Sequence, residues 1–263
     1  MLNSVIAVVK EAAKLAVNAN LTIKDKGGNV ADVVTSADIA VQNYLQDKLM
    51  EIVPSADFLG EESNPHELTS DYLWIVDPID GTMNFTRELH NSAISVALQY
   101  KGEVILGVVY NFFTDDLYYA ERGKGAYNNG KQIHASQRPF NESLLCTAFN
   151  QYKKEHAPIC FDIISELFPM CNDIRRLGSC AMELCYIAAG KCDCYFELRI
   201  SSWDSAAGEL ILREAGGTAY RFFSDKFLYK PLPLIATNTE ENLKIIYDVV
   251  NKHLQKNKFE EKI

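Results

Sequence analysis

Hydrophobic residues recur at helical spacing in the first part of the chain. The pattern over residues 5–18 predicts an amphipathic helix, and a second helix is predicted to follow Ser36. The apolar face of this second helix is formed by Val41, Tyr44, Leu45, Leu49 and Ile52. Between the two helices, residues 24–29 combine lysine, aspartate, glycine and asparagine, so we expect a mobile loop there.

Strand patterns follow these two helices. An apolar run over residues 73–76 predicts a buried strand, and alternation over 94–100 and 106–110 predicts two more, joined by a turn at Lys101-Gly102. Residues 117–120 continue the meander, and Asn129-Gly130 is a typical hairpin turn sequence. The first half is therefore predicted to be rich in antiparallel strands.

Strands and helices alternate in the second half. Strands are predicted over residues 145–149, 173–176, 193–197 and 234–236, and helices over 161–168, 179–189, 204–215 and 241–253. This combination indicates an α+β to α/β fold. With 263 residues, 48% of them hydrophobic, the chain can bury a substantial core. We predict a single domain over residues 1–263, with subdomains of about 1–140 and 141–263.

The most distinctive chemistry lies in the stretch from Asp77 to Thr82, which reads Asp-Pro-Ile-Asp-Gly-Thr. We expect Asp77 at the end of the strand over residues 73–76, because Pro78 favours a turn or a helix start over continuation of the strand. Carboxylate oxygens suit Mg²⁺, Mn²⁺ or Ca²⁺ better than zinc or copper. Ordinary turn chemistry also explains Asp-Pro and Asp-Gly, so the six residues alone leave both interpretations open.

Two further acidic positions lie in similar contexts. Glu61 and Glu62 follow a short apolar run, and Asp204 follows Trp203 at the start of a predicted helix that stops at Gly216-Gly217. Taken singly, a solvated acidic loop and an N-capping aspartate explain these residues. Taken with Asp77 and Asp80, they indicate one site built from several carboxylates.

Composition excludes several functional classes. A formal net charge of −9 and a pI near 5.1 lack the basic footprint of nucleic-acid-binding proteins. No apolar run reaches the roughly 18 residues needed to cross a membrane, so a cytoplasmic location is expected. The seven cysteines do not form paired zinc-binding motifs, and we expect them to act as small buried hydrophobic residues.

Residues 125–131 match most of a nucleotide-binding P-loop. However, Gln132 stands where that motif needs Ser or Thr to bind Mg²⁺. The surrounding sequence predicts a hairpin rather than the strand and helix that flank a P-loop. Nucleotide hydrolysis by this segment is therefore not expected.

The order of the acidic motifs resembles the inositol monophosphatase family, the Mg²⁺-dependent, lithium-sensitive sugar and inositol phosphatases. The positions that carry the resemblance are Asp38, Glu61-Glu62, Asp77 to Thr82, and Trp203-Asp204 followed by Gly216-Gly217. Segments 123–130 and 176–179 also look like family segments, so the resemblance covers nearly the whole chain. It implies layered α-β-α-β-α packing and, by analogy with the family, a homodimer.

The resemblance also implies the metal ligands and the groups that act on water. The Mg²⁺ ions, for which Mn²⁺ could substitute, would be bound by Glu61, Asp77, the backbone carbonyl of Ile79, Asp80 and Asp204, with Asp77 bridging two ions. Thr82 and Glu61 would position and activate the attacking water. Asp38 would support the Thr82 hydroxyl.

The substrate contacts follow from the same resemblance. The backbone N–H groups of Gly81 and Thr82 would hold phosphate oxygens, and Glu197 would accept hydrogen bonds from sugar or inositol hydroxyls. Arg199, two residues further on, either contacts substrate or faces solvent.

The implied activity is a phosphomonoesterase that acts on inositol monophosphate or a similar polyol phosphate. A fructose-1,6-bisphosphatase or broad sugar phosphatase is the nearest alternative within the fold. A 3′-phosphoadenosine 5′-phosphate phosphatase fits less well, because Met83-Asn84-Phe85 resembles the inositol-type sequence. A noncatalytic binding protein that has kept the fold is the alternative from another class.

Overall fold

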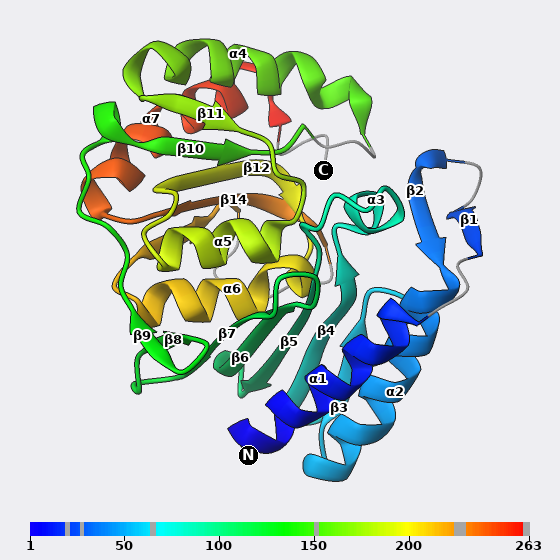
Figure 1. The fold of residues 1–263 in the computed structure, drawn as a ribbon. Helices are drawn as coiled ribbons and strands as arrows, with labels where there is room; N and C mark the ends of the chain where they lie inside the picture. Colours follow the sequence, from blue (N-terminus) through cyan, green and yellow to red (C-terminus); the bar gives the residue numbers. More distant parts are fainter. Residues whose placement is uncertain (19–21, 27–28, 64–66, 150–152, 224–229, 260–263) are drawn as a thin grey trace.

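Five layers of alternating helices and sheets make up the computed structural model of this chain (Figure 1). The structure describes residues 1–18, 22–26, 29–63, 67–149, 153–223 and 230–259. Two helices cover a seven-stranded sheet, two more lie between this sheet and a five-stranded sheet, and a last pair covers the outer face (Figure 1). The predicted α-β-α-β-α packing is confirmed.

The first two layers come from the N-terminal half. Helices α1 (Leu2–Val17) and α2 (Ser36–Ile52) pack on the seven-stranded sheet, in which only β3 and β4 run parallel. Its strands, in spatial as in chain order, are β3 (Asp57–Gly60), β4 (Tyr72–Asp80), β5 (Ala93–Tyr100), β6 (Glu103–Asn111), β7 (Asp116–Glu121), β8 (Ala126–Asn128) and β9 (Lys131–Ile133).

Side-chain alternation explains why this sheet is buried on both faces. Trp74 and Val76 of β4 join the apolar cluster under α1 and α2, whereas Leu73 and Ile75 join the cluster of the central helices. Successive residues of a strand point to opposite faces, so one apolar run serves both layers.

The second sheet belongs to the C-terminal half and has the order β11-β10-β12-β14-β13. Strand β10 pairs in parallel with β11 and β12, whereas β14 is antiparallel to both of its neighbours. The strands span β10 (Leu144–Thr147), β11 (Asp173–Arg175), β12 (Cys194–Ile200), β13 (Thr218–Arg221) and β14 (Leu232–Thr237).

The remaining helices flank this second sheet. Helices α5 (Cys180–Ala188) and α6 (Ser202–Glu214) lie between the two sheets, and α4 (Ala157–Leu167) and α7 (Glu240–Lys256) cover the outer face (Figure 1). The short α3 (Thr82–Thr86) follows β4. Among the described residues, no helix is long and apolar enough to cross a bilayer.

Two expectations about local structure are wrong. Residues 24–26 do not belong to a loop: β1 (Ile23–Lys26) pairs with β2 (Asn29–Thr35), while positions 27 and 28 lie outside the described residues. Strand β4 does not end at Asp77, as expected, but continues through Pro78 to Asp80. The hairpin prediction for residues 127–133 is confirmed, with Asn129 and Gly130 both at positive φ between β8 and β9.

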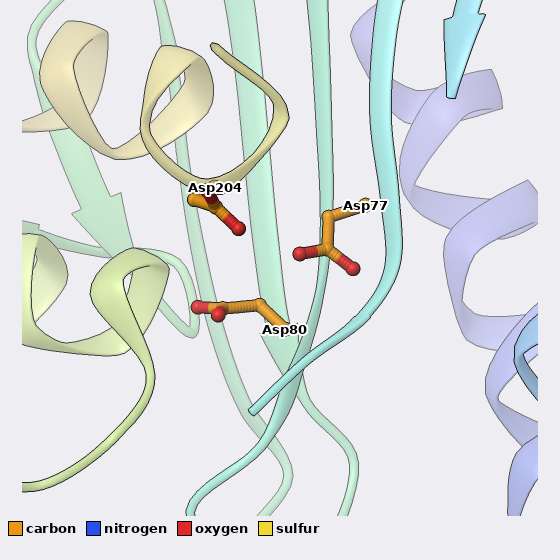
Figure 2. Close-up of side chains that lie close together, drawn as sticks. All are labelled: Asp77, Asp80 and Asp204. Atoms are coloured by element: carbon orange, nitrogen blue, oxygen red, sulfur yellow. The ribbon is translucent and has the colours of Figure 1, made fainter. Parts of the chain in front are cut away.

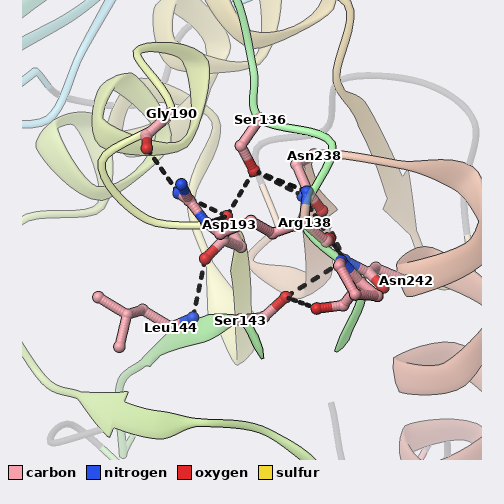
Figure 3. A network of polar contacts seen from close by, with 9 residues as sticks. Ser136, Arg138, Ser143, Leu144, Gly190, Asp193, Asn238 and Asn242 are labelled. Carbon is pink, nitrogen blue, oxygen red and sulfur yellow. Dashed lines mark hydrogen bonds and ion pairs between the residues drawn. The ribbon is translucent and has the colours of Figure 1, made fainter. Parts of the chain in front are cut away.

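A network of polar side chains ties residues 136–144, which follow β9 along the chain and lead into β10, to the second sheet (Figure 3). Its centre is Asp193, a buried carboxylate that accepts hydrogen bonds from Ser136 Oγ at 2.6 Å and from the backbone N–H of Leu144 at 2.8 Å. Arg138 forms an ion pair with the same carboxylate at 2.8 Å. Residues 136–144 are thus tied to the start of β12.

Candidate metal centre

Three aspartates from the two halves of the chain converge in one cleft (Figure 2). Asp77 and Asp80 come from β4 and Asp204 comes from α6. Each offers a carboxylate oxygen, and these three oxygens lie within 4.8 Å of one another. The structure therefore brings together three of the four predicted metal-binding carboxylates, and their oxygens are close enough to share bound cations.

A bulge in β4 aims both of its aspartates at this cleft. Asp77 lies opposite Ser95 and Asp80 opposite Ala93, so Pro78 and Ile79 together face the single residue Ile94. An extra residue of this kind bends a strand and redirects its side chains. Proline is tolerated at a bulge because it has no N–H to give to the ladder. The strand continues past Pro78 for this reason, and the two carboxylates still point to one site.

Asp204 is oriented by the helix that carries it. Its Oδ2 accepts a hydrogen bond from the backbone N–H of Ser201 at 2.9 Å, which completes a capping box at the start of α6. Ser95 Oγ donates to the carbonyl of Trp203 at 3.2 Å and so ties this first turn to β5. The carboxylate from the second half is thereby fixed beside the strand that neighbours β4.

Burial and mutual repulsion act on the charges of these groups. Burial raises the pKa of Asp77 well above its usual value, and Glu61, Asp80 and Asp204 raise it further by repulsion. The pKa of Asp204 rises for the same reasons, first burial and then repulsion by Asp80 and Glu61. Burial raises the pKa of Asp80 to about 7, although hydrogen bonds from Ser179 and Ala181 oppose the rise. A cluster of this kind favours cations or protons.

Glu61 lines the same cleft, directly after β3. Its backbone N–H donates to the carbonyl of Val76 at 3.1 Å, and the next N–H, of Glu62, donates to Gln42 Oε1 at 2.9 Å. The loop that carries Glu61 is thus held by both the sheet and α2.

Thr82 and Asp38 lie close together, but their contact is long. Thr82 Oγ1 donates to the carbonyl of Ile79 at 3.1 Å and lies 3.5 Å from Asp38 Oδ1. The other oxygen of Asp38 accepts from the N–H of Thr35 at 2.7 Å and from its hydroxyl at 2.5 Å, in the capping box of α2. Asp38 is therefore held chiefly by Thr35, with Thr82 at the edge of its reach.

Gly81 occupies a position that only glycine fits. Its φ is 84°, and a Cβ there would lie 3.0 Å from the carbonyl oxygens of Asn91 and Gly178. The left-handed backbone and the close approach both exclude a side chain. This geometry places the N–H groups at the start of the five-residue helix α3 along the cleft.

Glu197 stands on the wall that β12 contributes to the cleft. Its Oε2 accepts a hydrogen bond from the Tyr195 hydroxyl at 2.5 Å. Burial raises the pKa of Glu197 to about 7, and this hydrogen bond opposes the rise. The predicted substrate residue thus lines the same cleft as the aspartates.

Sequence reasoning assigned no role in the site to Ser179 or Glu183, which both line the cleft. Ser179 Oγ donates to Asp80 Oδ2 at 2.6 Å, and the N–H of Ala181 donates to the same oxygen at 2.7 Å. Glu183 is fully buried and accepts a hydrogen bond from the N–H of Leu177 at 3.1 Å. A serine before a predicted helix is a recognisable N-cap, but nothing in the sequence shows that it also reaches Asp80.

The cysteines behave largely as predicted. All seven are free, and six of them are buried, with only Cys171 partly exposed. Cys180 also lines the cleft, where burial raises the pKa of its thiol well above the usual value. A neutral thiol of this kind acts as a small apolar wall rather than as a ligand.

Comparison with known proteins agrees with this geometry. The profile of the Inositol monophosphatase family matches residues 2–255. "Nus factor SuhB" of Salmonella typhimurium is 40% identical over 199 residues, which cover 75% of this chain and 74% of that protein. "Inositol-1-monophosphatase" of Rhizobium meliloti is 38% identical over 200 residues, again 75% and 74% of the two chains.

A solved structure shares the fold over nearly the whole chain. The Thermotoga maritima IMPase superposes with a TM-score of 0.83 at 30% identity and covers 97% of this chain and 98% of its own. The profile match spans both sheets and every carboxylate of the cleft. This chain belongs to the inositol monophosphatase family.

Proposed function

We propose that this protein is a Mg²⁺-dependent phosphomonoesterase that hydrolyses inositol monophosphate or a similar polyol or sugar phosphate. The observation that carries the proposal is the convergence of Asp77, Asp80 and Asp204, with oxygens within 4.8 Å of one another. The cleft around them is also lined by Glu61 and Glu197. Family membership supports the same reaction class.

The donor set fits hard divalent cations. The charged neighbours that act most strongly on Asp77 are all carboxylates, namely Glu61, Asp80, Asp204 and Asp38. We assign the metal ligands to Glu61, Asp77, Asp80, Asp204 and the carbonyl of Ile79. Bound Mg²⁺ would neutralise charge on the phosphoryl oxygens and lower the pKa of a water molecule.

Glu61 and Thr82 act on the attacking water in this proposal. A neutral hydroxyl is a poor base, so Thr82 orients the water and Glu61 accepts its proton. Thr82 Oγ1 is held 3.1 Å from the carbonyl of Ile79, which limits the directions in which its hydroxyl points. Asp38, 3.5 Å away, supports that orientation.

Substrate contacts come from two sides of the cleft. The N–H groups of Gly81 and Thr82 are available to phosphate oxygens, because the first amides of a helix have no partner within it. Glu197 accepts hydrogen bonds from hydroxyl groups of the polyol. Tyr195 donates to Glu197 Oε2 at 2.5 Å, so in this proposal the other carboxylate oxygen accepts from the substrate.

Phosphate release with Mg²⁺ tests the proposal. The substrates are inositol 1-phosphate, fructose 1,6-bisphosphate, 2′-AMP and 3′-phosphoadenosine 5′-phosphate, ranked by kcat/KM. We expect Asp77→Asn and Asp204→Asn to lower kcat/KM by at least about 100-fold, because each removes a metal ligand. Far-ultraviolet circular dichroism should show that both variants keep the fold.

A matched variant controls for the loss of a negative charge. Asp173→Asn removes an exposed aspartate that pairs with Arg175 away from the cleft, and it should leave kcat/KM unchanged. Full activity of Asp77→Asn or Asp204→Asn, or of the wild type in excess chelator, would refute the mechanism.

The relatives named "Nus factor SuhB" favour a second role as a Nus factor. With a net charge of −9, the chain lacks a basic footprint, so we expect such a role to depend on a protein partner rather than on direct RNA contact. In a mobility-shift assay at physiological salt, the purified protein should leave single-stranded RNA unshifted. A tight shift would contradict this expectation.

A further inference from the structure

Arg199 stands on the wall of the cleft, on the same strand as Glu197. Along β12, Cys194, Phe196 and Leu198 point into the core beneath α4 and α7. Tyr195, Glu197 and Arg199 alternate with them and line the cleft. Arg199 therefore lines the same cleft as the proposed substrate residue Glu197, which lies two positions earlier on the strand.

A bulge in β12 sets the direction of Arg199. Glu197 lies opposite Leu234 and Ile200 opposite Leu232, so Leu198 and Arg199 together face the single residue Pro233. Bulges near active sites redirect side chains, as the bulge in β4 does for Asp77 and Asp80. The two strands that supply the cleft are thus both irregular at the residues that line it.

Arg199 has no protein partner in the part of the chain that the structure describes. It forms neither an ion pair nor a hydrogen bond there, although its side chain is only partly exposed. Arg138 and Arg221, by contrast, are each paired with a carboxylate. A partly buried guanidinium carries five donors, and its planar shape matches phosphate or carboxylate oxygens.

Glu197 does not explain this position. The arginine whose charge acts on Glu197 is Arg176, which follows β11 and also lines the cleft, and the Tyr195 hydroxyl occupies one Glu197 oxygen. Arg199 therefore adds a positive group to a cleft whose reacting centre is lined by carboxylates. Hydroxyl groups of a polyol can accept hydrogen bonds from a guanidinium, but only a second negative group of the substrate would also balance its charge.

We propose that Arg199 binds a second anionic group of the substrate, so that the protein prefers polyol or sugar phosphates that carry a further phosphate or a carboxylate. This inference rests on the proposed phosphatase function and specifies its substrate class. Arg199 is then a specificity-determining residue, which strengthens binding of the doubly charged substrate and takes no part in the attack on the ester.

Two matched pairs of substrates test the proposal. Fructose 1,6-bisphosphate is compared with fructose 1-phosphate, and 6-phosphogluconate with sorbitol 6-phosphate, in wild type and Arg199→Gln. For whichever doubly charged members the wild type prefers, Arg199→Gln should lower kcat/KM by roughly 10- to 100-fold, chiefly through KM, as expected for a lost charged hydrogen bond. The singly charged members should change less than about twofold.

A control variant and the two substrate pairs distinguish a specific effect of Arg199 from a general effect of losing an arginine, and a phosphate site from a site for any anionic group. Arg175→Gln removes an exposed arginine that lies outside the cleft, so it should preserve the preference. A preference within the first pair only identifies a second phosphate, and a preference within both pairs identifies any anionic group. An equal loss on all four substrates, or a wild type without preference in either pair, overturns the proposal.

Absence of turnover on every substrate would refute the proposed function but still leave Arg199 testable. Titration calorimetry in Mg²⁺ then compares the binding of fructose 1,6-bisphosphate and fructose 1-phosphate. Tighter binding of the bisphosphate by the wild type, lost in Arg199→Gln, supports the anion site. Equal affinities of the two sugars for the wild type overturn it.

Discussion

Asp193 shows how much one buried carboxylate can hold together (Figure 3). Four donor groups converge on its two oxygens, from Ser136, Arg138 and the N–H of Leu144. Asn238 extends the network by donating to Ser136 Oγ at 2.9 Å and to the carbonyl of Arg138 at 3.0 Å. The carboxylate itself is fully buried, whereas the Arg138 side chain is partly exposed, so the network joins a buried acceptor to partly buried donors.

We predict that Asp193→Ala lowers the free energy of unfolding by about 2–4 kcal/mol, because it removes a fully buried carboxylate that is the shared partner of four donor groups. Asp173→Ala is the matched control, since Asp173 pairs with Arg175 but both side chains are nearly half exposed. Its loss should cost less than about 1 kcal/mol. Urea denaturation measures both values, and equal effects of the two substitutions would contradict the assignment.

At the level of single residues, the sequence predicted what short motifs encode. Asp77, Asp80 and Asp204 could be placed at one site because each lies in a short motif next to an apolar run or helix start. Ser179 and Glu183 could not, because their partners, Asp80 and the N–H of Leu177, are met only in the folded chain. No local pattern distinguishes such residues from an ordinary cap or a surface glutamate.

Helix α6 can reach the first sheet closely only because small residues meet there. A Cβ on Gly107 of β6 would lie 2.8 Å from the carbonyl oxygen of Ala207. Backbone atoms cannot yield at that distance as a flexible side chain can. Gly107 thus allows α6, the helix that carries Asp204, to pack at a short distance from the sheet that carries Asp77 and Asp80.

Gly107→Ala should therefore lower both stability and metal affinity. Overpacking of this kind costs about 1–3 kcal/mol, and it should push the first turn of α6 away from β4. Val104→Ile adds one carbon on the same strand at a half-buried position and should have a smaller effect on both quantities. Thermal unfolding and calorimetric titration with Mg²⁺ are the measurements. Unchanged Mg²⁺ affinity in Gly107→Ala would show that α6 is not displaced.

Helices and strands with a long apolar face were predicted well. Strands whose formation or extent depends on pairing with a neighbouring strand were predicted less well. The second helix was found from its apolar face, and α2 carries Val41, Leu45 and Leu49 buried as expected. The β1–β2 hairpin was missed because its residues around 24–29 have turn and charged character, and strand formation there depends on the partner strand. The extension of β4 was missed because a bulge accommodates Pro78.

The whole molecule encloses an unusual concentration of buried acid. Burial is the largest cause of a raised pKa at six carboxyl groups, namely Asp38, Asp77, Asp80, Glu183, Glu197 and Asp204. In an unfolded chain the pKa values of these carboxyl groups return to 3.8 for aspartate and 4.5 for glutamate. Near neutral pH the unfolded chain holds these carboxyl groups ionised. The metal-free chain therefore has to take up protons when it folds.

The direction in which stability changes with pH follows from this difference in pKa between the folded and the unfolded chain. Between about pH 4 and pH 7 the folded protein binds more protons than the unfolded chain, so the stability of the metal-free protein falls as pH rises. We expect a lower Tm at about pH 7.5 than at about pH 5.5, and Mg²⁺ should raise the Tm most at the higher pH. Asp204→Asn should weaken both effects. A metal-free Tm that increases over this range would refute the prediction.

The two-sided origin of the acidic cluster has a consequence for biosynthesis. Asp77 and Asp80 belong to the first sheet, but Asp204 lies on a helix formed more than a hundred residues later in the chain. A chain that ends before α6 carries Asp77 and Asp80 but lacks Asp204. The proposed metal site is therefore complete only after translation has passed α6 and the two halves have docked.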